Sequence, residues 1–228
     1  MSGKWQRITL AALVLSVSGA VRAPAGVVLV TSQTALAPDD SIDWGQLGPD
    51  STSLPSSTAV ISAGGLSAMA STGDPTGLVR ADEGLSWVGN FTNGDHLISN
   101  STFSDYPFTI EFATPIGGAG AQIQLDRNGP FTSTIQAFSG NTSLGTFTED
   151  GLSTSSQDGS AIFIGVLDSR AEITSIVFGI ETPPPFQGDF AINSLLINTL
   201  GAVPEPASLV LAAIAIPAVI GLWLRRRK

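Results

Sequence analysis

The sequence predicts an all-β fold: an antiparallel β-sandwich of jelly-roll type, flanked by an N-terminal signal helix and a C-terminal transmembrane helix. Three observations lead to this prediction. Short segments alternate apolar and polar residues, turns rich in Gly, Asn, Asp and Pro separate them, and no internal stretch keeps a 3.6-residue period. The 228 residues have room for one domain plus targeting segments, and the absence of cysteine excludes disulfides and thiol catalysis.

The N-terminus is typical of a secretory signal peptide. Lys4 and Arg7 supply positive charge before an apolar stretch at residues 8–21. That stretch has the length of a signal-peptide core and is too short to span a membrane. The sequence therefore assigns residues 1–37 to export.

The position of signal cleavage is open between two sites. Residues 18–20, Ser-Gly-Ala, fit the rule of small residues around the cut, and so do residues 35–37, Ala-Leu-Ala, although Pro38 would then follow. A second apolar stretch at residues 25–30 lies between the two sites and could extend the export segment. We expect the ectodomain itself to begin at residue 38.

The clearest strand signals lie in the C-terminal part of the predicted ectodomain, residues 38–198. Strands are expected at residues 108–112, 122–126, 131–138, 144–148, 161–167, 173–180 and 190–198. The run at 161–167 is apolar on both faces and should form a central strand. Asp126-Arg127-Asn128-Gly129 predicts a tight hairpin between its flanking strands, because Asn-Gly adopts the positive φ angles of such turns. Trp44 and Trp87 are expected in the core.

The C-terminus has the layout of a membrane anchor. Residues 207–224 carry no charge and would span about 27 Å as a helix, just enough to cross a thin hydrocarbon core. The chain then ends on the basic residues Arg225, Arg226, Arg227 and Lys228. Basic residues stay on the cytoplasmic side, and the positive N-terminal region belongs there too, so residues 38–203 are expected outside the inner membrane.

A short motif precedes this helix: Val203, Pro204, Glu205 and Pro206. The prolines keep the backbone extended and unpaired, as a processing enzyme requires. Pro-Glu-Pro, an apolar helix and a basic end together resemble the PEP-CTERM sorting signal of exopolysaccharide-producing bacteria. The resemblance covers residues 204–228, after a linker at 199–203. It implies that a membrane transpeptidase, exosortase, removes the helix and releases or re-anchors the body at the cell surface. A plain membrane tether is the alternative.

The ectodomain carries a resemblance of its own. It is similar to an uncharacterised β-sandwich domain of exported bacterial proteins with the same tail. The segments that carry the similarity are residues 43–48, 87–91, 118–124, 131–138 and 161–166. This resemblance implies the fold and transfers no catalytic residue.

Charge is distributed unevenly along the chain. Residues 38–203 hold 18 of the 19 acidic residues and only three of the 10 basic ones, Arg80, Arg127 and Arg170, a net charge of −15. Such a field repels the phosphate backbone and argues against a nucleic-acid partner. It is compatible with an attraction for cations, or simply with a well-solvated surface.

The residue types needed for hydrolysis are sparse. His96 is the single histidine, and in Asn-Gly-Asp-His it is interpreted as a solvated loop residue rather than as the base of a triad. Three adjacent acid pairs occur, at residues 39–40, 82–83 and 149–150. Neighbours on a strand point to opposite faces, so neither member faces the other as glycoside hydrolysis requires, although carboxylates could converge from separate strands.

Calcium is the metal the sequence leaves open. Carbohydrate-binding sandwiches often hold a structural Ca²⁺ with loop carboxylates and carbonyls. The candidates in suitable loops are Asp126, Asn128, Asp158 and Asp189, none at EF-hand spacing. No other cofactor is expected.

The sequence favours a non-enzymatic module displayed at the cell surface or in the exopolysaccharide matrix, acting structurally or binding glycan through exposed aromatic and amide side chains. Exosortase, exopolysaccharide and, before processing, the membrane would be its partners. A carboxylate-dependent glycan hydrolase or lyase and a self-associating matrix protein remain alternatives.

Overall fold

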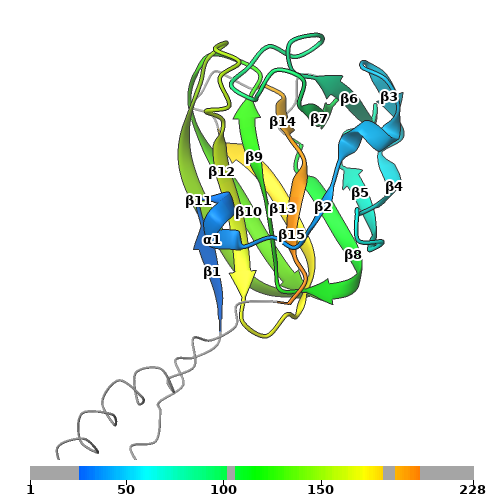
Figure 1. Ribbon diagram of the computed structural model, residues 1–228, viewed down its shortest axis with the longest axis vertical. Coiled ribbons are helices and arrows are strands. Elements are labelled where there is room, and N and C mark those ends of the chain that lie inside the picture. The colour runs from blue at the N-terminus through cyan, green and yellow to red at the C-terminus, as the bar shows by residue number, and fades with distance from the viewer. Residues whose placement is uncertain (1–25, 102–105, 182–187, 201–228) are drawn as a thin grey trace, which may run out of the picture. The chain divides into compact units, whose positions relative to one another are not determined.

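The computed structural model describes residues 26–101, 106–181 and 188–200, all within one compact unit, Ala25–Pro204. Two antiparallel sheets face each other (Figure 1). The predicted all-β sandwich is therefore confirmed. The predicted signal helix, transmembrane helix and Pro-Glu-Pro motif lie outside the described residues. No helix among the described residues is long and apolar enough to cross a membrane.

The first sheet, sheet A, contains nine strands. Its main path runs β1 (Val27–Val30), β12 (Ile162–Asp168), β9 (Gly118–Leu125), β14 (Phe190–Ile192), β7 (His96–Asn100), β6 (Leu78–Asp82) and β3 (Thr52–Leu54). β15 (Leu195–Asn198) continues along the same edge of β9 and pairs in turn with β2 (Asp40–Ile42). β9 is thus the strand that joins β12 on one side to β14 and β15 on the other.

The second sheet, sheet B, contains six strands. Its order is β11 (Thr142–Ser153), β10 (Gly129–Ser139), β13 (Ile173–Glu181), β8 (Phe108–Ile116), β5 (Ser67–Thr72) and β4 (Ser57–Ile61). A helical turn, α1 (Gln33–Leu36), and a 3₁₀ turn, η1 (Trp44–Leu47), complete the described elements. The strands before residue 101, each three to six residues long, were not individually assigned from the sequence.

The core lies between the sheets and is formed by the inward-facing residues of each strand. Burial alternates along β10 and along β13 from Ile176 onward: Ile135 and Phe178, for example, are fully buried while their neighbours are not. Phe108 of sheet B meets Phe190 of sheet A with ring centroids 4.5 Å apart. Trp44 is fully buried in the core, as predicted, and Trp87 is buried in a smaller cluster beneath the loop that follows β6.

The predicted tight hairpin at residues 126–129 is wrong. β9 and β10 flank this turn but belong to different sheets, so the chain crosses the sandwich there. Of the four residues only Gly129 has a positive φ, +140°. The tight turn lies instead at Gly140-Asn141, where Ser139 pairs with Thr142 and Gly140 adopts φ +55°. Alternation identified the strands, but it does not distinguish neighbours in one sheet from strands facing across a core.

The run at 161–167 forms β12, an interior strand next to the edge of sheet A. It is apolar on both faces because both are covered. Ile164 and Val166 face the main core, whereas Phe163 is packed on the opposite face against Val30 and Leu36. The predicted strand at 190–198 is divided at Asn193, between β14 and β15.

The structure moves the start of the domain ahead of residue 38. The apolar stretch at 25–30, expected as an extension of the export segment, is strand β1, which pairs with β12 from Val27 to Val30. α1 follows it and lies against β1, β9 and β12 (Figure 1). Short apolar runs suit a signal peptide and an edge strand equally well, so composition alone misplaced this boundary.

Glycines let β9 and β12 approach closely. A Cβ atom on Gly120 would lie 2.7 Å from Gly165 Cα and 2.7 Å from Phe163 Cζ. We expect Gly120→Ala to lower the free energy of unfolding by about 2 kcal/mol, because backbone at that distance cannot move aside without strain. Urea denaturation of residues 25–204 measures this. Thr148→Ala, at an exposed position of β11, is the control and should stay within about 0.5 kcal/mol of the parent. An unchanged midpoint for Gly120→Ala would contradict the close approach.

Candidate functional site

A hollow of about 460 Å³ opens beside the end of β11. It is bordered by β11, by the loop from β11 to β12, and by the loop after β6. The residues around it are Asn90, Asp150, Gly151, Leu152, Thr154, Ser156, Asp158, Ser160 and Ile162. Hydroxyl groups, carboxylates and one amide therefore surround a single exposed apolar side chain, Leu152, which is 61% exposed.

Asn90 fixes the hollow by joining its two loops. Its Nδ2 donates to Thr154 Oγ1 (2.7 Å) and Ser160 Oγ (2.8 Å), and its Oδ1 accepts from the Thr154 backbone N–H (2.5 Å). The backbone adds a bond from Ala161 N to Asn90 O (3.0 Å). The wall of the hollow is therefore held in place before any ligand arrives.

A second amide supports Asn90 from below. Gln124 of β9 is 1% exposed, and its Nε2 donates to Asn90 Oδ1 (2.9 Å) and to Thr154 O (3.0 Å). Its Oε1 accepts from the Asn90 backbone N–H. A buried polar side chain is tolerated when its hydrogen bonds are made, and these bonds tie the loops to the central strand of the sheet.

The hollow is acidic. Asp158 Oδ1 accepts hydrogen bonds from Ser160 Oγ (2.6 Å) and Ser160 N (3.0 Å), and these bonds hold the pKa of that carboxyl below its usual range. Asp150 Oδ1 accepts from Thr132 Oγ1 (2.8 Å). No basic residue borders the hollow. It therefore presents carboxylate and hydroxyl oxygens to any ligand.

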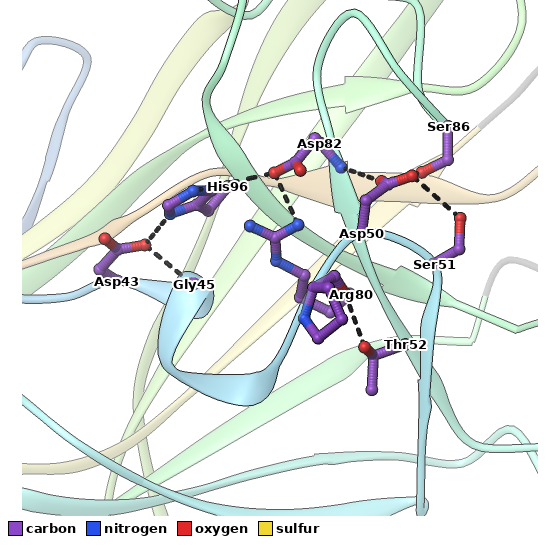
Figure 2. Close-up of polar contacts among 10 residues, drawn as sticks. Asp43, Gly45, Asp50, Ser51, Thr52, Arg80, Asp82, Ser86 and His96 are labelled. Carbon is purple, nitrogen blue, oxygen red and sulfur yellow. Dashed lines mark hydrogen bonds and ion pairs between the residues drawn. The ribbon is translucent and has the colours of Figure 1, made fainter.

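His96 takes part in a polar cluster instead of a solvated loop, which corrects the expectation from the sequence (Figure 2). It is the first residue of β7, and its side chain is 39% exposed. Nδ1 lies 2.7 Å from Asp43 Oδ1, and Nε2 lies 3.8 Å from Asp82 Oδ1. Gly45 packs against the imidazole so closely that a Cβ atom there would lie 2.3 Å from Nδ1.

Arg80 is the buried cation of this cluster. It is 3% exposed, and its Nη1 lies 2.7 Å from Asp82 Oδ1. Asp50 approaches from the other side, where its Oδ1 accepts from Asp82 N (2.7 Å) and Ser86 Oγ (2.5 Å). Desolvation would raise the pKa of Asp50, but the bonds from Ser86, Asp82 and Ser51 and the charge of Arg80 together lower it.

The cluster has the chemistry of a structural joint. The Asp43 carboxylate caps η1 by accepting from Gly45 N, and it also contacts His96 Nδ1. Desolvation would raise the pKa of Asp43, but these two contacts lower it. A triad would need a hydroxyl on the second imidazole nitrogen. In the described residues that position faces Asp82, and the hydroxyl of Ser86 is bonded to Asp50 instead. The joint fastens η1 to β6 and β7.

The acid pairs do not form facing pairs. Asp39 binds Thr199, and Asp40 binds Ser41 N and Gly64 N. Asp82 belongs to the joint, whereas its neighbour Glu83 is buried with Oε1 accepting from Gly89 N (2.7 Å). Two carboxylates do converge on the hollow from separate segments, Asp150 and Asp158.

The calcium candidates are distributed over three places. Asp126 and Asp189 meet through a backbone bond of 2.8 Å, Asn128 Oδ1 accepts from Ser155 Oγ (3.3 Å), and Asp158 lies in the hollow. In the part of the chain that the structure describes, no three acidic or histidine side chains are grouped to hold a metal ion.

The residues that build the hollow were missed by the sequence, apart from Asp158 and Asp150. Asn90 belongs to an Asn-Phe-Thr triplet, and Gln124 occupies a polar position of a predicted strand. The alternating pattern of β9 could have pointed to them. Two glutamines occupy its polar positions, and a strand face of this kind is buried only where loops cover it. Of the aromatic side chains that the structure describes, none borders the hollow. Among the described aromatic side chains, Tyr106 alone is exposed (42%).

Comparison with known proteins identifies no family for this chain. No protein-family model matches the chain, and no curated protein matches it. Among solved structures, TmCBM61 in complex with β-1,4-galactotriose aligns with 57% of this chain and 88% of its own, at 11% identity and a TM-score of 0.30. A likeness this low supports no conclusion about fold or ligand.

The pH dependence of stability tests whether Glu83, in the loop that carries Asn90, is buried. Burial, with Asp95 nearby, raises the pKa of Glu83 above 4.5, although the Gly89 N–H opposes this. The folded state therefore binds the proton more tightly than the unfolded state, and stability falls as pH rises from about 4.5 through the folded pKa. Glu83→Gln keeps an acceptor for Gly89 and should remove this loss, so the variant gains on the parent as pH rises.

Urea midpoints between pH 4 and pH 8 measure this difference. Glu111→Gln, which removes one exposed carboxylate from β8, reports the effect of net charge alone. Parallel curves for the parent and Glu83→Gln would show that the Glu83 carboxyl does not titrate differently in the folded state.

Proposed function

We propose that this protein is a non-enzymatic glycan-binding module, displayed outside the cell, and that the hollow beside β11 is its sugar subsite. The observation that carries the proposal is the preformed wall of the hollow. Asn90, itself held by Gln124, fixes the hydroxyl groups of Thr154 and Ser160 beside an open space of about 460 Å³. Binding sites of this kind lose little entropy when a ligand enters.

The chemistry of the hollow suits a sugar. Ser156, Thr154 and Ser160 offer hydroxyls, Asp158 offers a carboxylate, and sugar hydroxyls complement both as donors and acceptors. Leu152 offers an apolar contact for the C–H face of a ring. Because the border is acidic and has no basic residue, the favoured ligand is a neutral or amino sugar, whereas a polyuronate would be repelled.

A glycan hydrolase is the second candidate, because Asp150 and Asp158 border one hollow. Hydrolysis requires one carboxyl group that stays protonated as general acid, and hence one with a raised pKa. The pKa of Asp158 is lowered instead. Glu83, whose pKa is raised, is buried and does not border the hollow. Asp158 is therefore suited to the ionised role of such a pair and not to that of the general acid.

Export and sorting belong to the same proposal. The signal-peptide layout at residues 1–20, the Pro-Glu-Pro motif at 204–206 and the basic end support secretion, recognition by an exosortase and delivery to the cell surface or exopolysaccharide matrix. A sandwich that binds glycan would be retained there after its anchor is removed.

The binding proposal predicts loss of affinity when the Asp158 carboxylate is neutralised. Residues 25–204 should bind neutral or amino-sugar oligosaccharides in calorimetry, and Asp158→Asn should weaken binding about tenfold, because a charge-assisted hydrogen bond is lost. Glu111→Gln, at an exposed position of β8 that does not border the hollow, is the control and should bind like the parent.

Three results would each count against the proposal. Equal affinities of Asp158→Asn and the parent would remove the hollow as the site. Release of reducing ends during incubation would replace binding by hydrolysis. A protein that binds no oligosaccharide but forms oligomers would favour a self-associating matrix role.

The sorting proposal predicts that Glu205→Ala leaves the protein in the membrane fraction of its host. The carboxylate between the two prolines is the charged element of the motif, so its loss should impair recognition several-fold or more. Fractionation and immunoblotting measure this, with Glu181→Ala as control. A Glu205→Ala variant that reaches the surface at the parental level would favour a plain tether.

A further inference from the structure

We infer that signal cleavage occurs before β1, so the mature protein keeps residues 27–37 and the Ala-Leu-Ala sequence at 35–37 is not a processing site. This inference rests on the proposed export of the chain. It decides between two sites that the sequence leaves equal, because one of them lies inside the fold.

β1 is an integral strand of sheet A. Its four residues pair in antiparallel register with β12, from Val27 opposite Asp168 to Val30 opposite Gly165. Val27 and Leu29 pack against the main core, and Val30 is 8% exposed. A chain cut after residue 37 would lack this strand, and β12 would become an open sheet edge of the kind that promotes aggregation.

α1 covers the outer face of the same sheet. Ser32 caps it by accepting from Ala35 N (3.2 Å), and Leu36 is completely buried against Phe163 and Val30. Without Leu36 the Phe163 ring would face solvent. The second candidate site therefore coincides with a capped, packed turn, and its middle residue is part of a hydrophobic cluster.

The segment also holds the last strand of the domain. Asn198 of β15 is 7% exposed, and its Nδ2 donates to Leu36 O (2.9 Å) and Ala37 O (3.1 Å). Cleavage after residue 37 would remove the residues that supply both acceptors. The N-terminal segment thus fastens the C-terminal strand just before the chain leaves the described domain, and a mature protein without it would lose both contacts.

The remaining candidate cut is after Ala20. It lies at the C-terminal end of the apolar stretch at 8–21, where a signal peptidase cuts, and it leaves β1 intact. Cleavage after Ala20 would give a mature N-terminus at Val21.

The test uses the full chain, expressed in a bacterium that exports it, with intact mass and N-terminal sequencing of the product. The expected mature protein begins at Val21. Ala20→Gln should leave the precursor uncleaved or shift the cut within residues 21–26, because a large residue blocks the small-residue position. Ala35→Gln, at an exposed position of α1, should be processed like the parent.

A mature chain that begins at Pro38, or an Ala35→Gln variant that accumulates as precursor, would overturn the inference while leaving export intact. A full-length chain confined to the cytoplasm would overturn the inference together with export. As a second measurement, thermal unfolding should place residues 38–204 about 10 °C or more below residues 21–204, and equal midpoints would overturn the structural role of residues 27–37.

Discussion

Asn193 provides the interaction on which the arrangement of the loops depends. It lies at the break between β14 and β15, and its backbone O accepts from the Trp44 indole N–H (2.8 Å). Its Oδ1 accepts from Gln122 N (3.0 Å), and its Nδ2 donates to Gln122 Oε1 (2.8 Å) and Asp95 Oδ2 (3.1 Å). One residue therefore joins η1, β9 and the segment before β7. Each of these buried groups would cost about 1–3 kcal/mol if left unpaired.

This junction explains why the outer face of sheet A is polar and yet covered at Gln122 and Gln124 of β9. Gln122 and Gln124 alternate with core residues along β9, so they point away from the core. Gln122 Nε2 donates to Gly159 O (2.9 Å) and Ala161 O (2.8 Å), and Gln124 binds Asn90. The side-chain amides of Gln122 and Gln124 thus hold the two loops against the outer face of β9. Their fixed geometry, and hence the shape of the hollow, follows from side chains of the central strand.

Local patterns sufficed to predict the sandwich and its later strands, because alternation over residues 108–180 directly reflects one buried face. They failed at residues 126–129, where an ideal hairpin dipeptide connects two sheets, since the choice between neighbouring and facing strands depends on the whole core. They failed again at β1, whose four apolar residues resemble an export segment. The candidate site could be predicted only in part from the sequence. Asp158 stood out as a loop carboxylate, whereas Asn90 acquires its role from partners 34 and 64 residues away in sequence.

The three arginines of the domain do not offset the acidic charge at the hollow, and this affects which glycans can bind there. Arg80 is buried against Asp82, and Arg170 pairs with Glu172 at 2.5 Å, so neither offers a free positive charge at the surface. Arg127 is exposed beside Asp126 and does not border the hollow. A polyanionic glycan would therefore meet uncompensated carboxylates at the proposed subsite, and its approach would be opposed most strongly at low ionic strength.

An amino sugar would instead be attracted, because its ammonium group complements the Asp158 carboxylate, which hydrogen bonds from Ser160 keep ionised. Salt should then weaken the binding of an amino sugar and leave that of a neutral sugar nearly unchanged, so the salt dependence of affinity distinguishes charge complementarity from hydroxyl recognition within the same hollow.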